Sequence, residues 1–184
     1  GHAFAWPSGY HYTLTYDRRA DGRFAWDDRA RFDAEARRHA VVGRSGAVAI
    51  RTPSWLRGGD TATMCGGDAW TIDWFNRIGS ELARRGVEMV QVDQVVGANV
   101  QDCYSEAHGH APGPGEWQAR GFHRQMRTLL ETCRRHEAGA VVGFEEPNEH
   151  FLQEVGIQDY RDTQTPREPA SVFNYLYHEY VATF

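Results

Sequence analysis

The chain has 184 residues, of which 41% are hydrophobic and 24% are charged, a composition typical of a folded domain rather than of a disordered or fibrous chain. Its formal net charge is −5, and every basic residue other than histidine is an arginine. A chain without lysine cannot by itself complete the site of a Schiff-base aldolase, a pyridoxal-phosphate enzyme or a P-loop nucleotide hydrolase. The scattered arginines form no basic stripe, so nucleic acid is not an expected partner.

Cysteine content and hydropathy exclude further classes. The three cysteines are odd in number and contain no CxxC pair, which predicts neither a disulfide framework nor a zinc ribbon. No apolar run approaches the ~20 residues of a membrane span, and the first residues do not have the layout of a signal peptide. We therefore expect no membrane association, while a cytoplasmic and a secreted location both stay open.

The N-terminal third has irregular patterns. Residues 10–16 alternate like a strand, and residues 41–43 and 47–51 flank a short turn as a hairpin would. Residues 52–67 are rich in turn formers and predict a loop.

Two amphipathic helices follow, each leading into an apolar strand. Asp68 caps the first helix, which carries Trp70, Trp74, Ile78 and Leu82 and ends at Gly86. The second helix covers residues 116–136 and aligns five apolar side chains on one stripe: Phe122, Met126, Leu129, Leu130 and Cys133. Residues 87–92 and 140–144 then predict buried strands.

The C-terminal part continues the same alternation. Asn148 is expected to cap a short helix through residue 155, followed by a strand at 157–160 and a further strand at 171–177. Alternating helices and strands predict an α/β fold with a parallel sheet, either doubly wound or a (β/α)8 TIM barrel. A full barrel takes ~250 residues. We expect residues 1–184 to form one partial barrel, its central and later part, within a longer chain that supplies further barrel segments.

Acidic residues stand where the two clearest strands end. Asp93 and Gln94 follow the first strand, and Glu145 and Glu146 follow the second. Ligands bind at the carboxyl ends of parallel strands, which lie ~4.8 Å apart. Two inward-facing carboxylates there could approach the ~5 to 5.5 Å separation of a retaining glycosidase. The alternative for each acid is a helix cap or a solvated loop charge.

The loop of residues 94–115 is much longer than the ~2 to 6 residues of typical connections, which indicates a role in a site. Its polar side chains favour hydrogen bonding to substrate hydroxyls, and the candidates are Gln94, Asn99, Tyr104, His108 and His110. Cys103 with the two histidines could also bind a metal, but no second ligand pair is evident in the sequence. We therefore expect no metal ion and no cofactor. Cys65 and Cys133 have no evident imidazole partner.

Aromatic side chains could stack on a sugar ring. Trp117 follows the glycine break and is the best candidate, whereas Trp70 and Trp74 lie on a helix stripe and are expected in the core. Tyr177 and His178 would stand at the end of the last predicted strand and are further candidates for binding substrate.

Taken together in chain order, several motifs resemble a bacterial family of glycoside-hydrolase-like barrels carried as a domain of unknown function. The resemblance covers about residues 10–184 and rests on Val92-Asp93-Gln94, Cys103-Tyr104, His108-Gly109-His110, Gly113-Pro114-Gly115-Glu116-Trp117, Gly143-Phe144-Glu145-Glu146-Pro147-Asn148-Glu149 and Tyr177-His178-Glu179-Tyr180. It implies a TIM-barrel core within a longer chain, without indicating a substrate.

A more distant similarity suggests roles for the acids. α-Amylase-like enzymes and endo-α-N-acetylgalactosaminidases are retaining enzymes with an Asp nucleophile after the fourth strand and a Glu acid/base after the fifth. Asp93 and Glu145 are similar in order, although the loop between them is long here. Glu146 precedes a proline, which favours Glu145 as the acid/base, with Glu149 binding substrate or supporting the site.

These observations predict a glycoside hydrolase that acts on a carbohydrate or glycoconjugate. The alternatives are a metal-assisted hydrolase that uses His108 and His110, and a non-catalytic carbohydrate-binding barrel.

Overall fold

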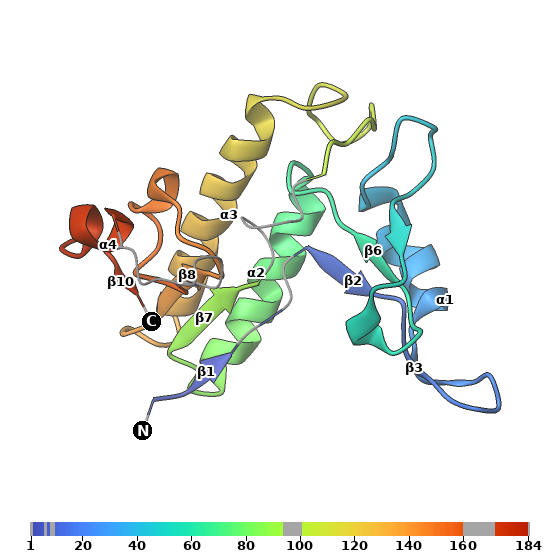
Figure 1. Cartoon of the computed structure of the whole chain (residues 1–184), viewed down its shortest axis with the longest axis horizontal. Helices are drawn as coiled ribbons and strands as arrows, with labels where there is room; N and C mark the ends of the chain where they lie inside the picture. The colour runs from blue at the N-terminus through green and yellow to red at the C-terminus, as the bar shows by residue number, and fades with distance from the viewer. Residues whose placement is uncertain (1, 6, 8–9, 94–100, 160–171, 184) are drawn as a thin grey trace. The chain divides into compact units, whose positions relative to one another are not determined.

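The computed structural model describes residues 2–5, 7, 10–93, 101–159 and 172–183 (Figure 1). The chain divides into two compact units. The first unit comprises residues 1–9, 73–100 and 122–184, and the second comprises residues 10–72 and 101–121.

A five-stranded sheet forms the centre of the first unit. Its order is β1-β7-β8-β9-β10, and every neighbouring pair is parallel. The strands are β1 (Phe4–Ala5), β7 (Met89–Val92), β8 (Val141–Phe144), β9 (Ile157–Gln158) and β10 (Ala182–Thr183). The predicted α/β class with a parallel sheet is confirmed, whereas the described strands form an open sheet and not a closed barrel.

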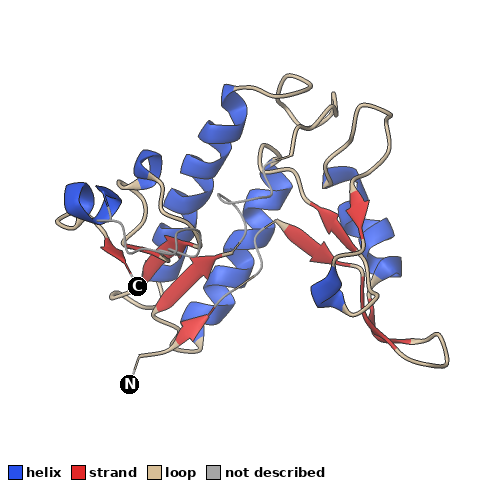
Figure 2. Ribbon diagram, viewed as in Figure 1, coloured by secondary structure: helices blue, strands red, loops and turns tan. Residues whose placement is uncertain are grey.

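Two long helices connect these strands (Figure 2). Helix α2 covers Ala69–Arg84 and α3 covers Glu116–Arg134. The Asp68 carboxylate accepts a hydrogen bond from the Trp70 N–H at 2.8 Å, as the predicted cap should. Gly86 has φ of +80° just beyond α2, which explains why glycine ends this helix.

The helix stripes match the prediction closely for α3 and less closely for α2. Phe122, Met126, Leu129 and Cys133 of α3 are buried. In α2 the buried hydrophobic side chains are Ile72, Phe75 and Ala83, whereas Trp70, Trp74, Ile78 and Leu82 are half-buried. The stripe of α2 is displaced because Gly79 meets α3, where an added Cβ would lie 2.3 Å from the Leu129 side chain.

One face of the sheet belongs to the hydrophobic core. Val90, Val92, Val142 and Phe144 are fully buried, and the Phe144 ring packs edge-on against Phe151 at 5.0 Å. Phe151 in turn contacts Phe122 of α3. Because side chains alternate along a strand, residues 91 and 143 point to the opposite face.

The C-terminal segment corrects one prediction. Residues 172–177 form helix α4 (Val172–Tyr177) and not a strand, and β10 comes after them; residues 160 and 171 lie outside the described part. Aromatic and β-branched residues favour a strand mainly where their side chains are buried against neighbours. The side chains of Val172, Tyr175 and Leu176 are exposed, so this preference has little effect here. The helix predicted after Asn148 is shortened to the turn η4 (Glu149–Phe151), capped by the Asn148 side chain.

The second unit is mainly antiparallel. A three-stranded sheet has the order β2-β6-β5, and β3 and β4 form a separate hairpin. The elements are β2 (His11–Thr13), β3 (Thr15–Arg18), β4 (Phe24–Asp27), α1 (Arg29–Arg31), η1 (Phe32–Ala36), η2 (Arg37–His39), β5 (Ile50–Arg51), η3 (Ser54–Leu56) and β6 (Thr61–Thr63).

The predictions for this unit were partly right. The strand expected at residues 10–16 is split at Leu14 into β2 and β3, and the expected hairpin is present with a Val42–Val48 bridge and Gly46 at φ +80°. The loop expected at 52–67 contains β6, so that prediction was wrong. β6 is only three residues long and stands among turn formers, so it forms no clear run in the sequence, yet all three of its residues are buried between β2 and β5. No helix in the described residues has the length and apolarity to cross a bilayer.

Candidate active site

Asp93 and Glu145 occupy equivalent positions on adjacent strands. Val92, the last residue of β7, pairs with Phe144, the last residue of β8, and each acid is the next residue along its strand. The Asp93 N–H donates to the Pro7 carbonyl at 3.1 Å, which continues the strand geometry through Asp93. The two predicted acids are therefore brought together at the carboxyl edge of the sheet.

Strand alternation places Asp93 on the face opposite the core. Val92 points toward the helices, so Asp93, whose N–H is still bonded to the Pro7 carbonyl, points the other way. Glu145 is the first residue of a bend that follows β8. Gln91 and Gly143 share this second face, and the Gln91 side chain is buried with no hydrogen-bond partner for its Nε2 atom among the described residues. The buried Gln91 amide, two residues before Asp93, makes this face of the sheet polar.

A third acid extends the row. Asp159 follows Gln158, the last residue of β9, and its N–H donates to the Phe144 carbonyl at 3.0 Å. Sequence reasoning did not select Asp159 because the strand was expected to continue through residue 160. The signal that could have found it is related to the one used for Asp93 and Glu145: an acid at the end of a short predicted strand, here after Ile157 and Gln158.

The loop after β8 is fixed by a buried amide. Gln158 is fully buried, accepts a hydrogen bond from the Asn148 N–H at 2.9 Å and donates to the Asn148 carbonyl at 3.1 Å. This pair holds the chain just after Glu145 and Glu146, which are both half-buried. Glu149 lies beyond it on η4 and is exposed.

Two candidates from sequence, Gln94 and Asn99, lie outside the described residues. Tyr177 and His178 precede β10 and therefore stand at the amino side of that strand, opposite to where Asp93 follows β7. The reason for selecting them, a position at the end of a strand, does not hold.

Four other candidates lie in the second unit. The Tyr104 hydroxyl accepts a hydrogen bond from Arg44 at 2.6 Å. Trp117 donates from its indole N–H to the Gly113 carbonyl at 2.9 Å and stacks on the His110 ring at 3.7 Å between centroids. One face of the Trp117 indole is therefore already covered.

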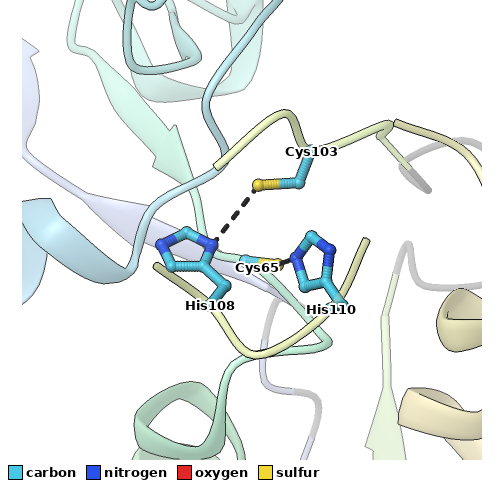
Figure 3. A group of neighbouring side chains, drawn as sticks. All are labelled: Cys65, Cys103, His108 and His110. Atoms are coloured by element: carbon cyan, nitrogen blue, oxygen red, sulfur yellow. Dashed lines mark hydrogen bonds between the residues drawn. The ribbon is translucent and has the colours of Figure 1, made fainter. Parts of the chain in front are cut away.

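The two loop histidines are engaged through both ring nitrogens. His108 contacts the Cys103 sulfur at 3.3 Å and the Arg38 carbonyl at 2.8 Å. His110 contacts the Cys65 sulfur at 3.1 Å and the Ala111 carbonyl at 2.9 Å (Figure 3). Neither ring has a nitrogen left for a sugar hydroxyl in this arrangement.

Cys65 thus has an imidazole partner that sequence reasoning did not find, since 45 residues separate it from His110. The pKa of the Cys103 thiol is lowered, chiefly by its interaction with Cys65, with further contributions from His108 and backbone N–H groups. Cys133 is different: burial raises the pKa of its thiol to about 11.

The fold is similar to parts of several solved glycosidase structures. An α-N-acetylgalactosaminidase of Bifidobacterium bifidum has a TM-score of 0.63 at 17% identity over 97% of this chain, and an α-galactosidase of Thermus thermophilus has 0.56 at 11% over 99%. A GH31 family sulfoquinovosidase from E. rectale has a TM-score of 0.57 at 9% identity over 86%. This chain covers 26%, 31% and 21% of these proteins, respectively, and the likeness at such identities shows a shared fold.

The chain itself belongs to the family described as a domain of unknown function, DUF6259, whose model matches residues 21–184. In addition, 54 residues are 44% identical to a Bacteroides thetaiotaomicron protein named "Putative glycoside hydrolase"; they make up 28% of this chain and 8% of that protein.

Proposed function

We propose that this chain carries the catalytic acids of a retaining glycoside hydrolase. The observation that supports the proposal is the register of β7 and β8: their last residues, Val92 and Phe144, pair, and Asp93 and Glu145 are the next residues of the chain at the carboxyl edge of a parallel sheet. Parallel strands lie ~4.8 Å apart, close to the ~5 to 5.5 Å between the carboxyl groups of retaining enzymes. Inverting enzymes need ~6.5 to 9.5 Å, which favours the retaining geometry for neighbouring strands.

The reaction has two steps. In the first, an Asp93 oxygen attacks the anomeric carbon while Glu145 donates its proton to the departing glycosidic oxygen, so that a glycosyl ester forms and the C–O bond to the leaving group breaks. In the second, the Glu145 carboxylate takes a proton from water, the water oxygen bonds to the anomeric carbon, and Asp93 is released. Glu145 ends protonated, as it began.

The surrounding groups suit these roles. The Gln158–Asn148 hydrogen bonds hold the loop three residues after Glu145, which supports a defined position for this acid. Asp159, one strand further, is in position to accept hydrogen bonds from sugar hydroxyls. The names of the similar proteins, which include an α-N-acetylgalactosaminidase and an α-galactosidase, support an α-glycoside as the substrate class.

The test compares two alanine variants in the protein at its natural length. Asp93→Ala should abolish turnover of every glycoside. Glu145→Ala should lose ~10²- to 10⁴-fold on substrates with a poor leaving group and much less on activated aryl glycosides, because a good leaving group needs no proton. Azide should rescue Glu145→Ala and yield a glycosyl azide of retained configuration, since azide attacks without a general base.

Glu131→Ala, an exposed acid on α3, serves as the matched control and should behave like the parent. Activity in Asp93→Ala would refute the mechanism. If Glu145→Ala kept its activity on poor leaving groups while the Glu146 or Glu149 variant lost it, the acid/base would be assigned wrongly. Sugar binding without turnover of any activated glycoside would instead indicate the carbohydrate-binding alternative.

A further inference from the structure

Four potential metal ligands converge in the second unit. Cys65 follows β6 by two residues, and Cys103, His108 and His110 come from the long loop before α3. One donor atom from each of these side chains lies within 4.8 Å of the donors of the other three (Figure 3). Cys65, Cys103 and His108 are buried and His110 is half-buried.

The spacing of these atoms fits a tetrahedral ion. Zn–S bonds of ~2.3 Å and Zn–N bonds of ~2.0 to 2.1 Å at tetrahedral angles put sulfur and nitrogen ligands ~3.5 Å apart. The two sulfur–nitrogen distances here are 3.1 Å for Cys65–His110 and 3.3 Å for Cys103–His108. Both distances are a few tenths of an ångström shorter than this value. Binding of an ion between the four ligands would therefore move each sulfur and nitrogen only slightly apart.

The hydrogen bonds of the outer ring nitrogens also support a metal site. His108 places Nδ1 inward and its other ring nitrogen on the Arg38 carbonyl, while His110 places Nε2 inward and its other ring nitrogen on the Ala111 carbonyl. A ring N–H that donates to a carbonyl leaves the inward nitrogen as a lone-pair donor, which is the arrangement found around metal-bound histidines.

The Cys103 sulfur also accepts a backbone hydrogen bond. The Val42 N–H donates to it at 3.5 Å. Hydrogen bonds of this kind to the ligand atoms are typical of the surroundings of protein-bound metals.

We propose that Cys65, Cys103, His108 and His110 bind one structural zinc ion. Two sulfurs and two imidazole nitrogens in a tetrahedral set are typical of zinc, and four protein ligands close the coordination sphere, so no position is left for a catalytic water. The ion would fasten the loop before α3 to the end of β6. This proposal replaces the expectation from sequence that no metal is bound, and it also argues against the metal-assisted hydrolase.

The first experiment measures zinc in protein purified with a thiol reductant. Elemental analysis should find one zinc per chain in the parent protein and less than a tenth of that in Cys103→Ser and His110→Asn. Cys133→Ala and His136→Asn are the matched controls: Cys133 is a buried cysteine of α3, and His136 is an exposed histidine that hydrogen-bonds Ser80. Both should keep one zinc per chain.

A second experiment uses the parent protein alone, so it does not depend on the folding of any variant. X-ray absorption at the zinc edge should show two sulfur and two nitrogen ligands, and cobalt substitution should give the intense visible bands of a tetrahedral site. Absence of stoichiometric metal, a zinc bound only by nitrogen and oxygen, or a Cys65–Cys103 disulfide in the reduced preparation would each overturn the proposal. Glycosidase activity is not measured, so the outcome is independent of the function proposed above.

Discussion

Gly143→Ala should disturb both the stability of the first unit and the geometry of the strand-end acids. Gly143 lies in β8 between Gln91 of β7 and Ile157 of β9. A Cβ at this position would lie 2.3 Å from the Ile157 carbonyl oxygen and 2.6 Å from its Cγ2, whereas ordinary contacts of a Cβ start at 3.4 Å. Backbone cannot rotate away as a side chain can, so β8 and β9 must separate by about 1 Å.

The size of the effect follows from that displacement. Overpacking of this kind costs about 1 to 3 kcal/mol, and each kcal/mol lowers Tm by roughly 2 to 4 °C in a chain of this length. Glu145 is two residues further along the chain, directly after β8, and moves with the end of that strand. A misplacement of ~1 Å in a catalytic site can reduce the rate ~10²-fold, so kcat/KM on a poor-leaving-group glycoside should fall by about that factor.

The assay pairs thermal unfolding with kcat/KM, and Gly139→Ala is the control. Gly139 stands in the turn before β8, has no positive φ, and its added Cβ would meet only the Glu137 carboxylate at 3.5 Å. Gly139→Ala should therefore match the parent in both measurements. If Gly143→Ala also matched the parent in Tm, the close approach of β8 and β9 would be wrong; if only Tm fell, Glu145 would not be coupled to β8 as argued.

Two further predictions concern ionisable groups. Burial, together with Arg51, lowers the pKa of His11 to about 4. As the pH falls from about 6.5 to about 4, the unfolded chain takes up a proton that the folded chain does not, so the free energy of unfolding should decrease in that window. Denaturant titrations of His11→Gln should no longer show this pH dependence, and an NMR titration of His11 with a midpoint near 6.5 would contradict the prediction. Glu154 is 3% exposed and contacts Arg127 and His123, both at 3.1 Å. Glu154→Gln should therefore cost about 1 to 3 kcal/mol in the free energy of unfolding, against no change for Glu131→Gln, and equal unfolding midpoints would refute the stabilising role.

Local patterns in the sequence were sufficient for the regular part of the fold. The caps and glycines around residues 68–86 and the apolar runs before residues 93 and 145 act within a few residues of chain, and α2, α3, β7 and β8 follow them. The same patterns located Asp93 and Glu145, because an acid directly after a buried parallel strand is placed by the strand itself.

Weaker local signals gave errors. β6 has only three residues among turn formers and is a strand because it pairs with β2 and β5. The aromatic and β-branched residues of α4 favour strands only weakly, and they form a helix. Asp159 was missed for a related reason, since the end of β9 is set by its pairing with β8 and not by its own residues.

The cysteine–histidine cluster shows most clearly what the sequence alone determined. From the sequence, Cys103, His108 and His110 formed three possible ligands in one loop, and Cys65 was a cysteine without a partner. Only the tertiary structure brings the four residues together. The antiparallel pairing of β6 with β2 and β5 determines the position of Cys65. The Cys103–Gly113 bridge folds the loop so that its histidines lie near the two cysteines. Strand ends are determined locally, whereas a ligand set drawn from segments about 40 residues apart depends on contacts that no local pattern contains.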